Sequence, residues 1–259
     1  GFVEACELIT GRKADDATDP ERAARTRRKA EADQRRRANE AAAYRERARR
    51  EAYELWQKRC GYDEAASAKL RDYLGIRAID LSARRSEREL PALGFVAELP
   101  WMESFVSETG NDGWRCVDIA AAMLAAIQQP DGRFGGVHIT WIDLAQPKGR
   151  LVLPRDEHDK PRPTKKVRGT KKGCAIRLYT PEQPRRLVMG EGIETTLTAA
   201  CHAFEPDTAY WAGIDIGNMG GKAIYVDGRA VHDQPDMDDV ECFSPPDWCE
   251  ELIYLGEAD

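Results

Sequence analysis

An acid next to a glycine, Glu191–Gly192, separates two contrasting patterns in the sequence. Residues 187–189 are a short apolar run bounded by polar residues, which is typical of a buried parallel strand, and residues 193–200 have helical spacing. Ligands of open α/β sheets bind at the carboxyl ends of the strands, and Gly192 would permit the tight turn into the following helix. Glu191 is therefore either a metal ligand or an acid near a helix N-terminus.

Two further acids follow a second short apolar run. Residues 251–255 predict a final strand that ends shortly before Glu257 and Asp259. If this strand lies beside residues 187–189, the two acids and Glu191 meet at one rim of the sheet. Carboxylates suit Mg²⁺ or Mn²⁺, and Mg²⁺ commonly binds one or two of them together with phosphates and water. Such a site favours phosphoryl or nucleotidyl transfer.

A basic segment precedes this predicted edge, and glycines interrupt it. Its cationic residues are Lys165, Lys166, Arg168, Lys171 and Lys172. Basic side chains beside glycine can approach phosphates closely, so the segment is predicted to be a loop that binds template or nucleoside triphosphate. A solvated basic turn is the alternative. His138, within a predicted strand, is interpreted as structural, and Asp215 either assists the metal site or forms a turn.

Charge is unevenly distributed along the chain, which has 259 residues and a net charge of −6. Residues 19–60 carry 14 basic and 8 acidic side chains, so the remainder is strongly acidic. A basic segment attached to an acidic body suggests a polyanion partner for the segment and a cation site on the body.

One long helix is predicted over residues 20–59, because Asp19–Pro20 provides an N-cap and a first-turn proline and most later residues are strong helix formers. Only Tyr44, Ala48, Ala52, Leu55 and Trp56 have the spacing of a helix face that packs against a core. We therefore expect only the C-terminal end of the helix to pack against the rest of the protein. The exposed part is either a solvated spacer or a nucleic-acid contact. The contact would be made by Arg25, Arg28, Arg35, Arg36 and Arg37.

Predicted strands and helices alternate along the rest of the chain. This indicates an α/β fold, mixed α+β overall, with a largely parallel sheet near the C-terminus. A helix is predicted over residues 64–74, an irregular segment through residue 99, and a β-hairpin from residues 122–127 and 137–142. Further strands are predicted at 175–178, 208–216 and 223–226, and an acidic loop at 231–246.

Several classes of protein are disfavoured by composition. No apolar stretch approaches membrane length, and residues 1–11 lack the basic start and apolar block of a signal peptide. A cytoplasmic protein without membrane contact is therefore expected. The seven cysteines are scattered and include no C-x-x-C pair, which argues against a disulfide framework or a zinc site within this chain.

These motifs resemble those of a known family. MGEGIETTLTAA, residues 189–200, resembles the first motif of the Toprim domain, and ELIYLGEAD, residues 251–259, is similar to the start of its Asp-x-Asp motif. AIQQPDGRFGGVHITWIDL followed by VRGTKKGCAIRLYTPEQPRRLVMGEGIET resembles the Toprim primases and primase-helicases of phages, plasmids and integrated elements. GFVEACELITG resembles the final helix of the zinc-binding module that precedes such primase cores.

The resemblance implies roles for individual residues. Glu191 matches the catalytic glutamate, which acts as an acid/base or metal-organising group, and Glu257 and Asp259 match the start of the metal-binding motif. That motif usually begins with aspartate, so Asp259 could be its first acid and Glu257 a bystander. The implied cofactor is Mg²⁺ or Mn²⁺, and Zn²⁺ belongs only to an upstream module.

The resemblance also implies an organisation and a function. Residues 1–18 would be the tail of the zinc-module helix with a linker, 19–60 a charged helix, 61–180 the N-terminal primase subdomain, and 181–259 a truncated Toprim domain. The chain would synthesise RNA primers on single-stranded DNA from nucleoside triphosphates, with a replicative helicase in cis or trans. The alternatives are an inactive Toprim-like module that binds single-stranded DNA for a helicase, and a Toprim nuclease.

Overall fold

The chain combines several helices with three sheets in the computed structural model, which describes Ile9 and residues 20–61, 64–80, 90–107, 109–226 and 228–256. This confirms the predicted α/β class with a long N-terminal helix. The chain divides into two units, residues 1–45 and 46–259. The helix tail predicted near the N-terminus, apart from Ile9, and both Glu257 and Asp259 lie outside the described residues.

Helix α2, Pro20–Gln57, confirms the predicted long helix. Ala52, Leu55 and Trp56 at its C-terminal end are buried, as the spacing predicts. Tyr44 was expected to pack with them but is 64% exposed, because it lies beyond the part of α2 that contacts the core. The guanidinium of Arg59 lies 3.8 Å from the ring centre of Trp56 and covers the docked end.

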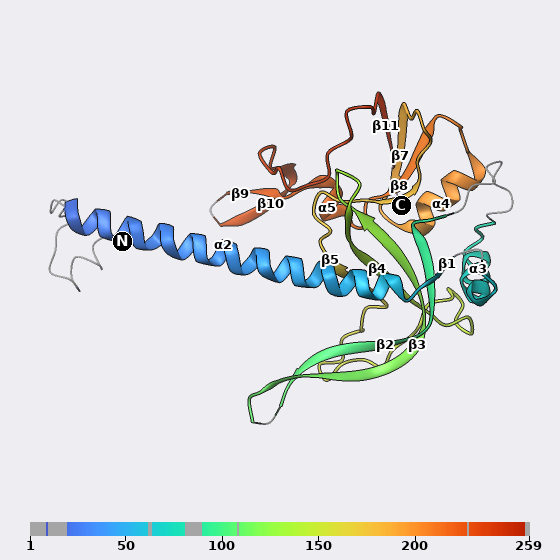
Figure 1. The fold of residues 1–259 in the computed structure, drawn as a ribbon, viewed down its shortest axis with the longest axis horizontal. Coiled ribbons are helices and arrows are strands. Elements are labelled where there is room, and N and C mark those ends of the chain that lie inside the picture. The colour runs from blue at the N-terminus through green and yellow to red at the C-terminus, as the bar shows by residue number, and fades with distance from the viewer. Residues whose placement is uncertain are drawn as a thin grey trace. The chain divides into compact units, whose positions relative to one another are not determined.

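The first sheet is antiparallel, with strand order β1-β2-β3-β4-β5. The strands are β1, Cys60–Gly61; β2, Leu93–Val106; β3, Asp112–Gln128; β4, Phe134–Ile142; and β5, Lys165–Gly169. The predicted hairpin is present as β3 and β4. Residues 93–99, expected to be irregular, belong to β2 because their backbone pairs with the strongly apolar β3. Figure 1 shows β2 and β3 continuing together as a two-stranded ribbon.

The prediction that Lys165–Gly169 form a loop is wrong. These residues form β5, which pairs antiparallel with β4 from Thr140 to Gly136. The segment is poor in strand-forming side chains, and its conformation is decided by backbone pairing to a neighbour that is distant in sequence. Lys171 and Lys172 follow in the turn after β5.

The second sheet has strand order β11-β7-β8-β6. Its strands are β6, Ile176–Tyr179; β7, Arg186–Gly190; β8, Thr208–Ala212; and β11, Glu251–Leu255. Strands β11, β7 and β8 are parallel and β6 is antiparallel, so the expectation of a largely parallel sheet is confirmed. Helix α4, Ile193–His202, connects β7 to β8.

Three elements predicted from the sequence differ from the structure in where they begin, where they end or how they are divided. The strand predicted over 208–216 ends with β8, and α5, Ile216–Gly220, follows it. The predicted acidic loop over 231–246 starts within β10, Arg229–Pro235, which pairs with β9, Ala223–Val226. The helix predicted over 64–74 is a 3₁₀ turn, Ala65–Ser67, followed by α3, Ala68–Ile76.

Residues 121–127 of β3 are buried on both faces of the sheet and connect the cores. Met123, Ala125 and Ile127 pack in the cluster that includes residues of α3, α4 and β6. Ala122 and Leu124, on the opposite face, pack with the docked end of α2. Successive strand residues point to opposite faces, so an unbroken apolar run serves two cores at once. This fixes the second sheet against the first.

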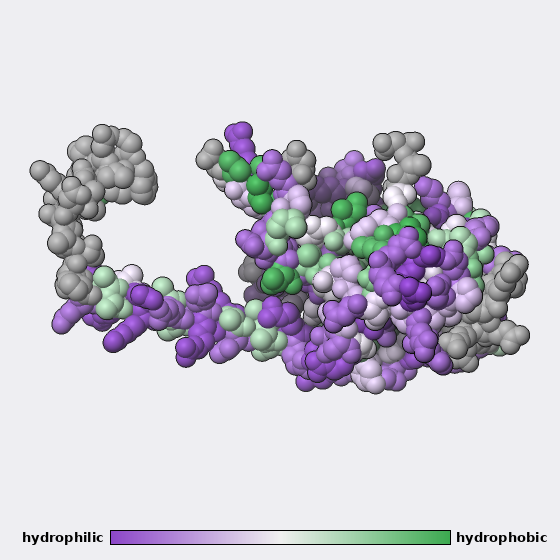
Figure 2. Space-filling model, turned by 90° about the horizontal axis from the view of Figure 1, so that it is seen from above, coloured by the Kyte–Doolittle hydropathy of each residue, from purple (hydrophilic) through white to green (hydrophobic). Residues whose placement is uncertain are grey.

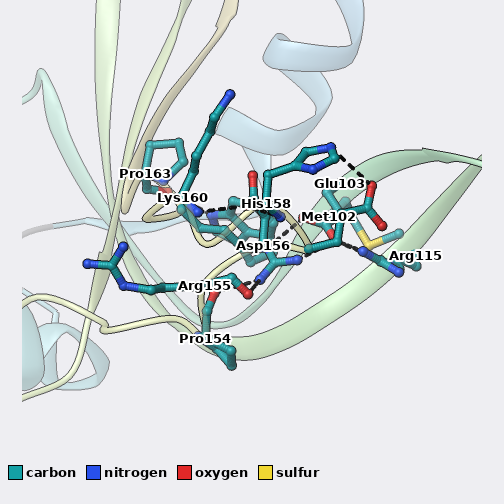
Figure 3. A network of polar contacts seen from close by, with 12 residues as sticks. Met102, Glu103, Arg115, Pro154, Arg155, Asp156, His158, Lys160 and Pro163 are labelled. Carbon is teal, nitrogen blue, oxygen red and sulfur yellow. Dashed lines mark hydrogen bonds and ion pairs between the residues drawn. The ribbon is translucent and has the colours of Figure 1, made fainter.

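The ribbon of β2 and β3 is held by a surface ion network (Figure 3). Glu103 accepts hydrogen bonds from Arg162 at 2.6 Å and from Arg115 at 2.6 Å. Hydrogen bonding from Arg162, opposed by burial and supported by Arg115, lowers the pKa of Glu103 to about 2. Arg162 also donates to the carbonyl oxygens of Pro154 and Arg155. The segment between β4 and β5 is thereby tied to the ribbon.

We predict that Gly136→Ala destabilises the protein by about 1–3 kcal/mol, because an added Cβ would clash with the Arg168 carbonyl oxygen across the β4–β5 pair. Gly75→Ala is the matched control. A Cβ at this exposed position in α3 meets nothing within 4 Å, and alanine should stabilise the helix by up to about 1 kcal/mol. Urea unfolding measures both, and equal stability of the two variants would contradict the prediction.

Candidate active site

Glu191 directly follows β7, as the sequence predicts, and Gly192 is the N-cap residue of α4. Gly192 has φ −104° and ψ 158°, an extended conformation open to any residue, so this turn does not need glycine. The glycine that packing requires is Gly190, where a Cβ would lie 2.8 Å from the hydroxyl oxygen of Thr196. Close contact between β7 and α4 therefore fixes the backbone that carries the half-buried Glu191.

Strand β11 lies beside β7, which is the condition for the acids that follow the two strands to share one rim. The two strands are parallel, with Tyr254 opposite Met189 and Leu255 opposite Gly190. The carboxyl end of β11 is therefore at the same edge of the sheet as Glu191. The convergence of Glu257 and Asp259 with Glu191 remains a prediction, because both acids lie outside the described residues.

A cavity of about 290 Å³ opens beside Glu191. Its polar lining consists of Arg77, His138, Arg150, Lys165, Glu191 and Thr195. Three of these side chains are cations, and the start of α4 adds the positive end of a helix dipole. Cations and first-turn N–H groups together bind anions such as phosphate. One carboxylate at the border of a cationic cavity is a suitable arrangement for handling a phosphorylated ligand beside a metal ion.

A second carboxylate, Glu194 in the first turn of α4, holds this cavity together. It is buried and accepts hydrogen bonds from the Tyr73 hydroxyl at 2.6 Å, from Arg150 at 2.7 Å and from Lys165 at 3.2 Å. Burial alone raises the pKa of Glu194, but Lys165, Tyr73 and Arg150 outweigh it and hold the pKa far below its usual range. Burial lowers the pKa of Lys165, although Glu194 opposes this. Burial, reinforced by Glu194, raises the pKa of Tyr73.

Glu194 is not among the site residues predicted from the sequence. Its signal was weak: an acid in the first turn of a predicted helix, three residues after Glu191, is common because it complements the helix dipole. Its partner Tyr73 is 121 residues away in the chain. No spacing rule connects the two, so only the folded chain identifies this cluster.

Two buried polar atoms at the cavity are unpaired among the described residues. They are Nδ1 of His138 and Nε of Arg77. Buried polar groups in folded proteins nearly always have a hydrogen-bond partner, so these two atoms call for a partner such as a water, an ion or a ligand. Ile214, which also lines the cavity, has φ 77°, a strained conformation for a β-branched residue. Strain of this kind concentrates at functional sites.

The five basic residues predicted to act together do not share one surface. Lys165 lines the cavity, whereas the adjacent Lys166 points to the other face of β5, donates to the Met102 carbonyl and lies over the Trp101 ring. Arg168 is exposed on β5. Lys171 pairs with Asp215 at 2.5 Å, and Lys172 pairs with Glu241 at 2.5 Å.

The structure shows the surroundings of Asp215 and His138, whose roles the sequence left open. Asp215 is the N-cap of α5 and accepts a hydrogen bond from the Asn218 backbone, so it forms a turn. His138 is buried on β4, in keeping with a structural role, but it also lines the cavity. Across the described part of the chain, no three His, Cys, Asp or Glu side chains form a group that could hold a metal ion.

Residues 46–178, just over half of the chain, match the model of a family described as a domain of unknown function, DUF7146. The chain belongs to this family. The matched range contains Arg77, His138, Arg150 and Lys165 and ends before Glu191. No curated protein and no solved structure matches the chain. None of the described helices has the length and apolar character that a membrane crossing requires.

The buried imidazole of His138 predicts a pH dependence of stability. Burial, reinforced by Lys165, lowers its pKa from 6.5 to about 4. Between these values the unfolded chain binds the proton and the folded chain does not, so stability is complete above pH 6.5 and falls as the pH drops toward 4. The loss is about 3 kcal/mol.

Urea unfolding of the wild type and of His138→Gln over this pH range measures the effect. The variant cannot titrate at this position, so from pH 7 to pH 4 the wild type should lose about 3 kcal/mol more stability than the variant does. Parallel curves for the two proteins would show that His138 does not titrate with a lowered pKa.

Proposed function

We propose that the chain is the catalytic core of a Toprim-type primase, which synthesises short RNA primers on single-stranded DNA by Mg²⁺-dependent nucleotidyl transfer. The observation that carries the proposal is the cavity in which the Glu191 carboxylate borders three cations and the start of α4. The resemblance of the motifs suggests the class of reaction, and the cations of the cavity suit the nucleoside triphosphate that this reaction uses. A replicative helicase in cis or trans is part of the proposal, as is a cytoplasmic location.

The residues of the cavity fit the needs of this reaction. The 3′-hydroxyl oxygen of a growing primer bonds to the α-phosphorus of a nucleoside triphosphate, the α–β phosphoanhydride bond breaks, and pyrophosphate leaves. Arg77, Arg150 and Lys165 would hold the triphosphate and offset the charge of the leaving pyrophosphate. Glu191 would accept the hydroxyl proton, directly or through water.

A divalent cation fits the donor set at this edge. Glu191 is a half-buried carboxylate at the carboxyl end of β7, and phosphates and water commonly complete the coordination of Mg²⁺. Glu257 and Asp259 remain the proposed further ligands. When bound, the ion would stabilise charge on the attacking and leaving oxygens. Glu194 is unsuited to this role because its oxygens already accept hydrogen bonds from Tyr73, Arg150 and Lys165.

Glu191→Gln should reduce primer synthesis by at least about 100-fold, because it removes the charge that accepts a proton and binds metal, while keeping the size of the side chain. Labelled nucleoside triphosphates, single-stranded DNA and Mg²⁺ provide the assay. Glu182→Gln, the same change at an exposed site before β7, should retain activity. Full activity of Glu191→Gln would sink the assignment. Mg²⁺-dependent nicking of DNA without triphosphates would favour a nuclease instead.

Arg77→Gln should weaken nucleoside triphosphate binding by about 10- to 100-fold, the usual effect of losing a charged hydrogen bond. Arg77 makes no ion pair with any described residue, so its loss should leave the fold intact. Lys69→Gln removes one positive charge from an exposed position of α3 and is the control. A fluorescent triphosphate titrated into each variant gives the dissociation constants. Equal affinities would remove Arg77 from the proposed site.

A further inference from the structure

The exposed part of α2 carries its basic residues mainly on one face. With 3.6 residues per turn, Arg25, Arg28, Lys29, Arg35 and Arg36 surround Ala32 on a single side of the helix. Arg37, which was expected to share a nucleic-acid contact with four of them, lies on the opposite side of the helix. We call these five residues the basic stripe. Arg28, Arg35 and Arg36 line a surface groove with Ala32, flanked by Glu31 and Glu40. The stripe spans about 16 Å along the helix axis.

Most of the stripe's charge is not neutralised within the chain. Arg25, Arg28, Lys29 and Arg35 make no ion pair with any of the residues that the structure describes. Arg36 pairs with Asp33 at 3.3 Å, but the Arg36 side chain is 67% exposed, and exposed pairs of this kind contribute little to stability. The stripe is therefore available to an external anion.

The surface of this segment argues against an apolar partner. Every described side chain from Glu21 to Arg45 is exposed except the half-buried Asp33, and apart from alanines the only large apolar residue in that range is Tyr44. Figure 2 shows hydrophilic side chains along most of α2 with small apolar patches between them. A coiled-coil or groove-binding partner would have no apolar stripe to bury. Charge complementarity instead selects a polyanion.

A straight row of cations favours a flexible strand over a duplex. The phosphates of a duplex wind around its axis, so a straight helix meets them over only a short crossing. A single strand can follow the helix face along its length. No aromatic residue lies on the stripe, so bases would not stack there, and binding would rest on phosphate contacts alone.

We infer that the basic stripe of α2 binds the phosphate backbone of single-stranded DNA independently of sequence. The surface lies within residues 20–45, none of which lines the cavity beside Glu191. Binding there requires neither Mg²⁺ nor nucleoside triphosphate. It would keep a template strand on the protein while the chemistry proposed at Glu191 proceeds elsewhere in the chain.

The test compares two triple variants of the full chain in EDTA. Arg25, Arg28 and Arg35 changed to Gln remove three unpaired charges of the stripe, whereas Arg27, Arg37 and Arg45 changed to Gln remove three charges from the opposite face. Arg and Gln have similar helix propensities, so circular dichroism should show equal helix content. The anisotropy of a labelled thymidine oligonucleotide, titrated over a range of salt concentrations, gives the affinity.

In the stripe variant the slope of log K against log salt should be shallower by about 2. Three charges are removed, and each phosphate contact on a single strand contributes about 0.7 to the slope. If the wild type and the stripe variant bind equally at 1 M salt, this difference in slope makes the variant bind about 100-fold more weakly at 0.1 M salt. The control variant should change by no more than a few-fold. Strand binding is measured in EDTA without nucleoside triphosphate, whereas the proposed chemistry is measured by primer synthesis, so failure of the chemistry and failure of this surface are separable.

Three results would overturn the inference. Equal losses in the two triple variants would mean that total charge, and not the stripe, binds DNA. Unchanged affinity in both would mean that DNA binds elsewhere. A loss confined to a labelled duplex, with single-strand binding intact, would show that the stripe contacts double-stranded DNA.

Discussion

The Glu194 carboxylate is buried on the first turn of α4 and is surrounded by Tyr73, Arg150 and Lys165, which come from three separate parts of the chain. Removing a carboxylate from water costs several kcal/mol unless cations and donors replace the water. All three partners must therefore be in place when α4 packs against its sheet. Because α4 starts two residues after Glu191, the cluster also fixes that acid relative to the cavity cations.

This electrostatic constraint depends on the apolar core around β3. Met123, Ala125 and Ile127 pack against residues of the second sheet and α4, while the other face of the strand packs against the end of α2. The two sheets cannot shift relative to each other without disturbing this strand. A rigid backbone of this kind lets two cations and a tyrosine converge on one carboxylate without the entropy cost of ordering them separately.

The residues of the proposed site are divided between the DUF7146 match and the segment that follows it. The matched residues supply the cations and the histidine of the cavity, and the segment after them supplies Glu191, Glu194 and the start of α4. Neither part alone makes the proposed site.

The cavity and the basic stripe also differ in physical character. Charges in the half-buried cavity are weakly screened, whereas those on the exposed stripe respond strongly to salt. The proposed chemistry and the proposed template binding should therefore depend differently on ionic strength.

Local periodicity and turn chemistry were enough to predict the long helix with its docked end, the hairpin of β3 and β4, and the strand–turn–helix that presents Glu191. The adjacency of β11 and β7 was only a condition for a shared acidic rim, and the parallel pairing of the two strands establishes it. Long-range contacts in the folded chain place Lys165 on a strand, put the Lys166 side chain on the other face of that strand, and let Glu194 organise the cavity. The reason is physical: β5 has little strand propensity of its own and is held by pairing to β4, and the partners of a buried charge are chosen by proximity in space, which spacing along the chain does not encode.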